Sequence, residues 1–264
     1  MSNIVPIAEN TKWYYRDGKP CTELPSADGK KMVSPTVVHA RKLWLLPSVT
    51  CILQTISEPY LEQWKIEQAL LVSLGNPKAA DETDEGYLTR ICSMAKDVVS
   101  LKADRGKEMH AEIEMSLNDP SYKTQDPACQ VALQSIHDRI EYYAKEYGQK
   151  PSVTTEGTFA NEDEGFAGRY DICLTFNFGI QVFLDVKTTD IAKFNKPYQK
   201  WGLQGAGYMI GMRTSDASVF EQVVVDRTSG ETQFHTWDKM SEMKIAFLGL
   251  RNAWCILNNL KTWK

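Results

Sequence analysis

The sequence lacks any uninterrupted run of about 18 apolar residues, so it predicts no membrane-spanning helix. Its first ten residues have neither the positively charged region nor the apolar region of a secretory signal peptide. It also lacks a CxxC pair, because the six cysteines stand apart at positions 21, 51, 92, 129, 173 and 255. We therefore expect an intracellular, cytoplasmic protein with reduced, buried thiols.

An excess of positive charge is missing as well. Thirty Lys and Arg against 34 Asp and Glu leave a net charge of −4, which excludes a uniformly basic, histone-like surface. The charge is unevenly distributed, since seven Lys and Arg stand against three acids between Thr11 and Trp44. Trp13, Tyr14 and Tyr15 are interleaved with them. Such rings suit stacking on single-stranded nucleic acid, and they equally suit an arm that packs on the core.

The hydrophobic fraction of 42% and the charged fraction of 24% are typical of a globular chain. The first 47 residues, rich in turn formers, predict short strands or an extended arm. Helical periodicity predicts helices that follow Pro47 and Glu58, and longer ones over 87–117, 127–147, 198–212 and 238–260. Alternating patterns predict strands over 153–159, 166–176, 180–188, 219–226 and 232–237. We expect one α/β domain over 1–264, with an N-terminal arm and helices in 1–150 and the sheet core in 151–264.

The strands over 166–176 and 180–188 carry the most informative pattern. A three-residue turn over 177–179 would pair Phe176 with Ile180 and place Asp171 opposite Asp185. One face of this hairpin is wholly apolar and is the predicted core side; it carries Tyr170, Ile172, Leu174 and Phe176 against Val186, Leu184, Val182 and Ile180. The other face places Lys187 beside both aspartates.

Two opposed carboxylates repel each other unless a cation neutralises them, and Mg²⁺ and Mn²⁺ prefer such oxygen ligands. Two acids and an ammonium group on one face are typical of metal-assisted phosphodiester hydrolysis. The lysine would orient or deprotonate a water molecule, or stabilise the developing charge. The alternative is a solvent-exposed polar face with a surface ion pair.

Four segments resemble a known family. Residues 168–171 (GRYD) and 185–187 (DVK) resemble the G-x-x-D…(D/E)-x-K signature of the PD-(D/E)XK nuclease superfamily. Residues 204–208 are similar to the Q-x-x-x-Y element of its RecB-like branch, and residues 106–110 resemble the upstream G-x-x-x-H element. The segments stand in the order that this family shows. Tyr170 replaces the proline of the superfamily name, as is common in RecB-like members.

A narrower resemblance covers the N-terminal part. Residues 47–50, 52–54, 61–65 and 106–110 are similar to mitochondrial genome maintenance exonuclease and its phage-type relatives, which are single-strand DNA exonucleases. The resemblance implies a restriction-endonuclease-like α/β core, with a mixed central sheet flanked by helices and an N-terminal helical extension that forms an arch or channel. It implies a metal-dependent DNA exonuclease of repair or recombination that acts on single strands or DNA ends. A recombination or replication protein is the implied partner, and a phage-encoded origin is compatible.

The resemblance also implies roles for individual residues. The metal ligands would be His110, Asp171, Asp185 and the backbone carbonyl of Val186, with Mg²⁺ or Mn²⁺ bound. The catalytic group would comprise Lys187, Asp171, Asp185, Gln204 and Tyr208. The nucleic-acid-binding residues would be Ser48, Thr50, Arg105, Lys107, Lys200, Gln204 and Tyr208. Some RecB-like nucleases hold an iron–sulfur cluster with four cysteines, but the cysteine spacing here predicts none.

Alternatives remain open at this point. His110, with Gly106 and Glu114 one turn away on the same helical face, could be structural. Glu156 could assist the metal or lie on the surface. Lys200, Gln204 and Tyr208 share a helical face that could contact phosphates, position Lys187, or pack on the sheet. At the level of function, the alternatives are an endonuclease of the same superfamily and a non-catalytic DNA-binding module.

Overall fold

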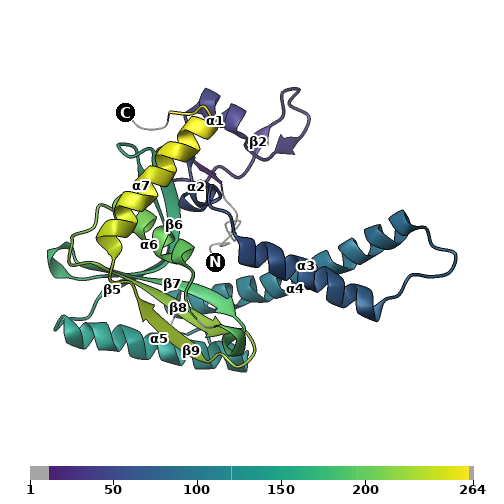
Figure 1. Ribbon diagram of the computed structural model, residues 1–264. Coiled ribbons are helices and arrows are strands. Elements are labelled where there is room, and N and C mark those ends of the chain that lie inside the picture. Colours follow the sequence, from purple (N-terminus) through teal and green to yellow (C-terminus); the bar gives the residue numbers. More distant parts are fainter. Residues whose placement is uncertain (1–11, 120, 195, 262–264) are drawn as a thin grey trace.

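The computed structural model describes residues 12–119, 121–194 and 196–261 (Figure 1). A five-stranded mixed sheet organises the C-terminal half, in the order β5-β6-β7-β8-β9. The strands are β5 (Ser152–Asn161), β6 (Phe166–Thr175), β7 (Gln181–Thr189), β8 (Val219–Asp226) and β9 (Thr232–Thr236). β7 and β8 are parallel, and α6 (Gln199–Gly211) provides the crossover that a parallel pair requires. The predicted α/β class with a mixed sheet is confirmed.

Helices cover both faces of this sheet (Figure 1). On one face, α2 (Val49–Leu53), α6 and α7 (Met240–Leu257) pack on Phe183 and Phe220. On the other, α5 (Pro127–Glu146) and the C-terminal part of α4 (Asp84–Asn118) pack on Leu184 and Val223. The hairpin is therefore buried on both faces. The alternative prediction of a solvent-exposed polar face is wrong at Cys173 and Phe183, which are each 1% exposed.

The predicted hairpin register is confirmed between the turn and Ile172. Phe176 N–H donates to Ile180 O, and the ladder continues to the pair Ile172–Leu184. Tyr170 departs from the predicted core face, because its ring packs on Phe183 at 5.4 Å between centroids, on the opposite side of the sheet. Gly157 makes this possible, since a Cβ there would lie 2.1 Å from the Tyr170 hydroxyl oxygen.

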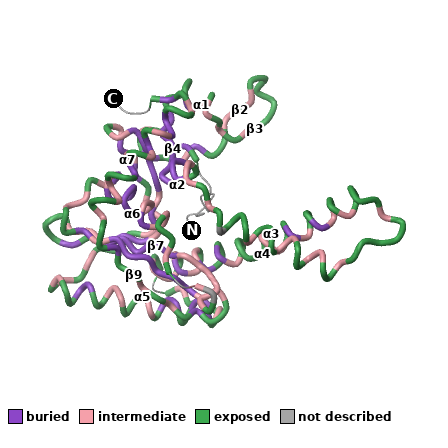
Figure 2. Tube along the Cα trace, in the orientation of Figure 1, coloured by how far each residue is buried: buried purple, intermediate pink, exposed green. Residues whose placement is uncertain are grey.

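A helical hairpin projects from the body of the molecule (Figure 1). It consists of α3 (Pro59–Gly75) and the first half of the 35-residue α4, and most of its surface is exposed (Figure 2). Thr83 caps α4 by accepting a hydrogen bond from Gly86 N–H. The C-terminal half of α4 returns to the sheet, where Met109 and Ile113 are buried. The sequence therefore places these helices within a few residues of their observed ends.

The N-terminal segment combines short strands with one helix: β1 (Trp13–Tyr14), β2 (Leu24–Pro25), β3 (Met32–Val33), α1 (Val37–Leu43) and β4 (Leu46–Pro47). The sequence analysis missed α1, since seven residues are too few to show a helical period. Trp13 and Tyr14 are each 3% exposed, so they pack on the core, whereas Trp44 is 66% exposed. Within the described ranges, no helix is both long and apolar enough to cross a membrane.

Candidate metal centre

A cavity of about 370 Å³ lies where α4, α6, the N-terminal segment and the edge of the β6–β7 hairpin meet. Each of the four sequence elements contributes to its lining, although they are spread over more than 100 positions. The lining includes Tyr14, Ser48, Thr50, Gly106, Lys107, His110, Glu156, Gly168, Arg169, Asp171, Val186, Lys187, Gln204 and Tyr208. The fold thus collects the predicted site residues in one place, with three exceptions: Asp185, Arg105 and Lys200.

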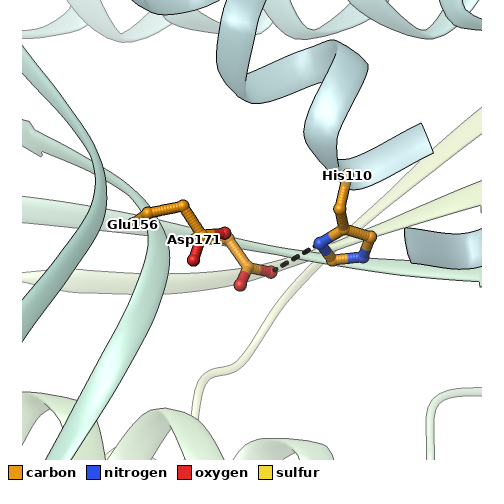
Figure 3. A group of neighbouring side chains, drawn as sticks. All are labelled: His110, Glu156 and Asp171. Carbon is orange, nitrogen blue, oxygen red and sulfur yellow. Dashed lines mark ion pairs between the residues drawn. The ribbon is translucent and has the colours of Figure 1, made fainter. Parts of the chain in front are cut away.

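Three side chains in the cavity converge as metal ligands would (Figure 3). His110, Glu156 and Asp171 each offer one donor atom, and these atoms all lie within 4.8 Å of one another. His110 Nδ1 lies 3.9 Å from Asp171 Oδ2. Carboxylate oxygens suit Mg²⁺ and Mn²⁺, and the imidazole nitrogen is a ligand for softer divalent cations. The donor set therefore fits a divalent cation.

Glu156 reaches this cluster through a distorted strand. Its φ of 50° is left-handed, and it interrupts the β5–β6 ladder between the pairs Thr155–Ile172 and Gly157–Tyr170. A non-glycine residue in this conformation costs free energy, and such strain concentrates at functional sites. The sequence analysis left Glu156 undecided between metal and surface. Its side chain is 17% exposed and faces the cavity.

Gly106 lets α4 approach the sheet closely enough for His110 to reach the cluster. A Cβ at Gly106 would lie 2.6 Å from Thr188 Oγ1 of β7. His110 follows one helical turn later and shares the face of α4 that lines the cavity. The glycine of the G-x-x-x-H element therefore allows the helix to approach β7. The histidine one turn later then places its imidazole near Glu156 and Asp171.

We expect Gly106→Val to weaken Mn²⁺ binding about tenfold, because the added side chain displaces α4 and His110 with it; outer contacts of metal ligands typically carry effects of this size. Isothermal titration calorimetry measures the change. Gly249→Val is the matched control, since a Cβ at Gly249 on α7 meets no atom within 4 Å. Equal Mn²⁺ affinities in the two variants would contradict the role of Gly106.

Asp171 is held by the backbone of β7. Val186 N–H donates to Asp171 Oδ2 at 2.7 Å. The β6–β7 ladder ends one position earlier, at Ile172–Leu184, and the carboxylate of Asp171 accepts the hydrogen bond instead of a backbone carbonyl. Asp171 and Asp185, which were predicted to lie directly opposite each other, are therefore not a pair of the ladder, since Ile172 and Leu184 are its last paired residues.

Asp185 lies outside the three-residue cluster. Its side chain is 1% exposed, and Lys187 Nζ lies 2.5 Å from its Oδ2. Gln222 Nε2 donates to Oδ2 at 2.6 Å and Gln204 Nε2 to Oδ1 at 3.3 Å. Burial raises the pKa of the Asp185 carboxyl, while Lys187 and Gln222 act in the opposite direction. Two amides and the lysine thus surround this carboxylate.

Lys187 lies beside two carboxylates, and its side chain is 24% exposed. Burial lowers its pKa, but the negative charges of Asp185 and Asp171 outweigh that effect, and the pKa is raised overall.

Gln222 is a site residue that the sequence analysis missed. It lies on β8 as the parallel partner of Asp185, and the same amide also donates to the Asp185 backbone carbonyl at 2.6 Å. Glu221 and Gln222 interrupt the apolar run from Val219 to Val225 on β8 and are both 0% exposed. A buried polar residue needs a partner, so this interruption was the available signal. Glu221 pairs with Arg139 on the opposite face.

The remaining predicted residues differ in their surroundings. Ser48 Oγ caps α2 by accepting a hydrogen bond from Cys51 N–H at 3.0 Å, and Thr50 follows at the cavity wall. Tyr208 is buried against Gln204, and burial raises its pKa well above the usual value. Lys107 lines the cavity and pairs with Asp104 at 2.8 Å.

Arg105 and Lys200 lie outside the cavity lining and have acidic partners. Lys200 pairs with Glu58, which joins α6 to the start of α3. Arg105 Nη1 lies 2.5 Å from Asp126 Oδ2, and Asp126 also caps α5 by accepting a hydrogen bond from Ala128 N–H at 2.9 Å. These contacts are structural, and a role in nucleic-acid binding stays a prediction for both residues.

Asp126→Ala is expected to lower the free energy of unfolding by about 2 kcal/mol at pH 7, because it removes a helix cap and a half-buried ion pair. The Arg105 guanidinium holds the pKa of Asp126 below its usual range. Stability from a depressed carboxyl pKa is present above the unfolded-state value and is lost as the pH falls through the folded-state value. Urea denaturation at pH 7 and near pH 3 should therefore show a difference that shrinks in acid. Asp138→Ala, at an exposed position of α5, is the control.

Comparisons with known proteins give low similarities. No family model matches the chain, and no curated protein matches it. Among solved structures, SSO0001 matches with 12% identity and a TM-score of 0.32, over 56% of this chain and 84% of that one. A "Putative exonuclease" from Eubacterium rectale matches with 14% identity and a TM-score of 0.35, over 59% of this chain and 68% of that one. At TM-scores this low, neither similarity defines the function of this chain.

Proposed function

We propose that this protein is a metal-dependent deoxyribonuclease with a PD-(D/E)XK core of the RecB-like type. One observation carries the proposal: four short sequence elements, each weak alone, contribute side chains to one cavity. That cavity contains a cluster of one histidine and two carboxylates, with an ammonium group from the same sheet. A structural explanation of any single element would not require the others to converge on it.

In this proposal, His110, Glu156 and Asp171 hold Mg²⁺ or Mn²⁺, and Asp185 and the Val186 carbonyl are further candidate ligands beside them. When bound, such a cation polarises a phosphoryl oxygen and lowers the pKa of a bound water molecule. Lys187 stabilises the negative charge that develops on the phosphate. Gln204 and Gln222 keep the Asp185 carboxylate in place, and Asp185 in turn keeps the Lys187 ammonium directed at the reacting group.

The substrate we propose is single-stranded DNA or a free DNA end, delivered by a recombination or replication protein. Ser48, Thr50 and Lys107 stand in the cavity wall, where hydroxyl and ammonium groups suit phosphate oxygens. In the same proposal, the helices and arm of residues 1–150 flank a channel for the strand, and residues 151–264 supply the catalytic core of a single domain.

A nuclease assay tests this function. End-labelled linear single- and double-stranded DNA and closed circular DNA are incubated with Mg²⁺, with Mn²⁺ or with a chelator. We expect metal-dependent loss of linear single strands, no loss of circles, and no cleavage by an Asp185→Asn variant. Cleavage of circles would keep the site and make the protein an endonuclease. A folded protein that binds DNA but cleaves none of these substrates would be a binding module.

A further inference from the structure

Arg169 stands beside the metal-binding cluster. It follows Gly168 on β6 and lines the cavity together with Lys187 and Asp171. Its Nε lies 2.7 Å from Glu156 Oε2, and the two side chains are only 16% and 17% exposed. Glu156 thus pairs with the guanidinium of Arg169 on β6, and one of its carboxylate oxygens lies within 4.8 Å of donor atoms of His110 and Asp171.

We propose that Arg169 competes with the divalent cation for Glu156, and that the guanidinium moves to a phosphate of the nucleic acid when the cation takes up this carboxylate. The inference rests on the proposed function and assigns to that site the residue that couples metal binding to substrate binding.

The competition follows from charge. A guanidinium in contact with Glu156 neutralises part of the negative charge that attracts a cation to the cluster, and it repels a second positive charge nearby. Both side chains are largely removed from solvent, so water screens these interactions only partly. A cation that binds His110, Asp171 and Glu156 must therefore displace the ion pair between Arg169 and Glu156. Once bound, the cation weakens the attraction of the guanidinium to Glu156.

The destination of the guanidinium follows from its chemistry. Its planar array of N–H donors matches two oxygens of a phosphate at once, which an ammonium group does not do. Arg169 already lines the cavity in which Lys187 stands, so the guanidinium and the phosphodiester of the proposed substrate would share one cavity. Arg169 would then bind DNA well only when the metal is present, which makes DNA affinity depend on the metal.

The test uses three variants of the 264-residue chain. Arg169→Gln removes the charge, and Arg169→Lys keeps the charge but loses the planar fork. Arg213→Gln is the matched control, because Arg213 pairs with Asp163 on an exposed surface outside the cavity lining. Calorimetry measures Mn²⁺ affinity without DNA. Fluorescence anisotropy measures the affinity for a labelled single-stranded oligonucleotide, with Mn²⁺ or chelator, in an Asp185→Asn background that prevents cleavage.

We expect Arg169→Gln to bind Mn²⁺ about tenfold more tightly than wild type and to bind DNA about tenfold less tightly in Mn²⁺, as close charge pairs commonly produce changes of this size. With chelator, its DNA affinity should match that of wild type. Arg169→Lys should keep the wild-type Mn²⁺ affinity and lose DNA affinity in Mn²⁺. Arg213→Gln should change neither quantity.

Other results would overturn the inference, and they separate it from the proposed function. Weaker Mn²⁺ binding by Arg169→Gln would mean that Arg169 supports Glu156 as a ligand and does not compete. A lower melting temperature with unchanged affinities would make the residue purely structural. If neither wild type nor Arg169→Gln binds Mn²⁺, the metal centre itself is refuted. Conversely, opposite shifts in Mn²⁺ and DNA affinity without any cleavage by the native protein would uphold the inference and reject the nuclease.

Discussion

Asp171→Asn is expected to reduce DNA cleavage by about three orders of magnitude, because a metal centre contributes several kcal/mol to the reaction and each 1.36 kcal/mol is tenfold in rate. The variant replaces the charged carboxylate of a proposed metal ligand with a neutral amide. Its remaining side-chain oxygen still accepts the hydrogen bond that Val186 N–H donates, so the strand geometry should be retained. Calorimetry should show Mn²⁺ binding that is weaker by at least about a hundredfold.

Asp163→Asn is the control for this variant. Asp163 pairs with Arg213 at the surface and lies outside the cavity lining, so the same chemical change should alter neither cleavage nor metal binding. Circular dichroism in the near ultraviolet checks that both variants fold. If Asp171→Asn binds Mn²⁺ as tightly as wild type, Asp171 is not a ligand, and the metal centre must lie elsewhere.

Lys187→Met is expected to lower the single-turnover cleavage rate by about 10²–10⁴-fold, which is the usual effect of removing a group that stabilises transition-state charge. Methionine keeps most of the side-chain volume and loses the ammonium. Mn²⁺ affinity should stay the same or increase, because a positive charge leaves the neighbourhood of the cluster. Calorimetry beside the rate measurement separates this outcome from loss of the metal. Lys107→Met, at the cavity wall, is the matched control and should affect DNA affinity more than rate.

The same substitution should also destabilise the fold. Without Lys187, the Asp185 carboxylate stays buried with only the amides of Gln204 and Gln222 as partners. Breaking one side of a buried ion pair costs about 3–5 kcal/mol, and the lower value is expected here because the amides remain. The loss should diminish as the pH falls, since a buried carboxyl without its countercharge can bind a proton. Urea denaturation at pH 7 and pH 5 measures this; an equal loss at both would contradict the explanation.

Some features of the site could be predicted from the sequence because they depend on local periodicity. The helix over 84–118 and the β6–β7 turn follow from apolar spacing and a three-residue loop. These two elements place His110 and Asp171 in the same cavity. Gly106 and His110 are four positions apart, as are Gln204 and Tyr208, and residues at this spacing lie on the same face of any α-helix. For these residues, the neighbours along the chain are enough to determine the face on which they lie.

Other features were decided by segments far apart in the chain. The sequence alone determined the α/β class, the order of the main helices and strands, the hairpin register from the turn to Ile172, and the presence of the four motifs. Only the tertiary structure decided that Glu156 joins His110 and Asp171, that Gln222 holds Asp185, and that Arg105 contacts Asp126. The physical reason is that a carboxylate interacts with whichever charges and hydrogen-bond donors lie within a few ångströms. The packing of β5, β8 and α5 brings such groups together from positions that are remote in the sequence.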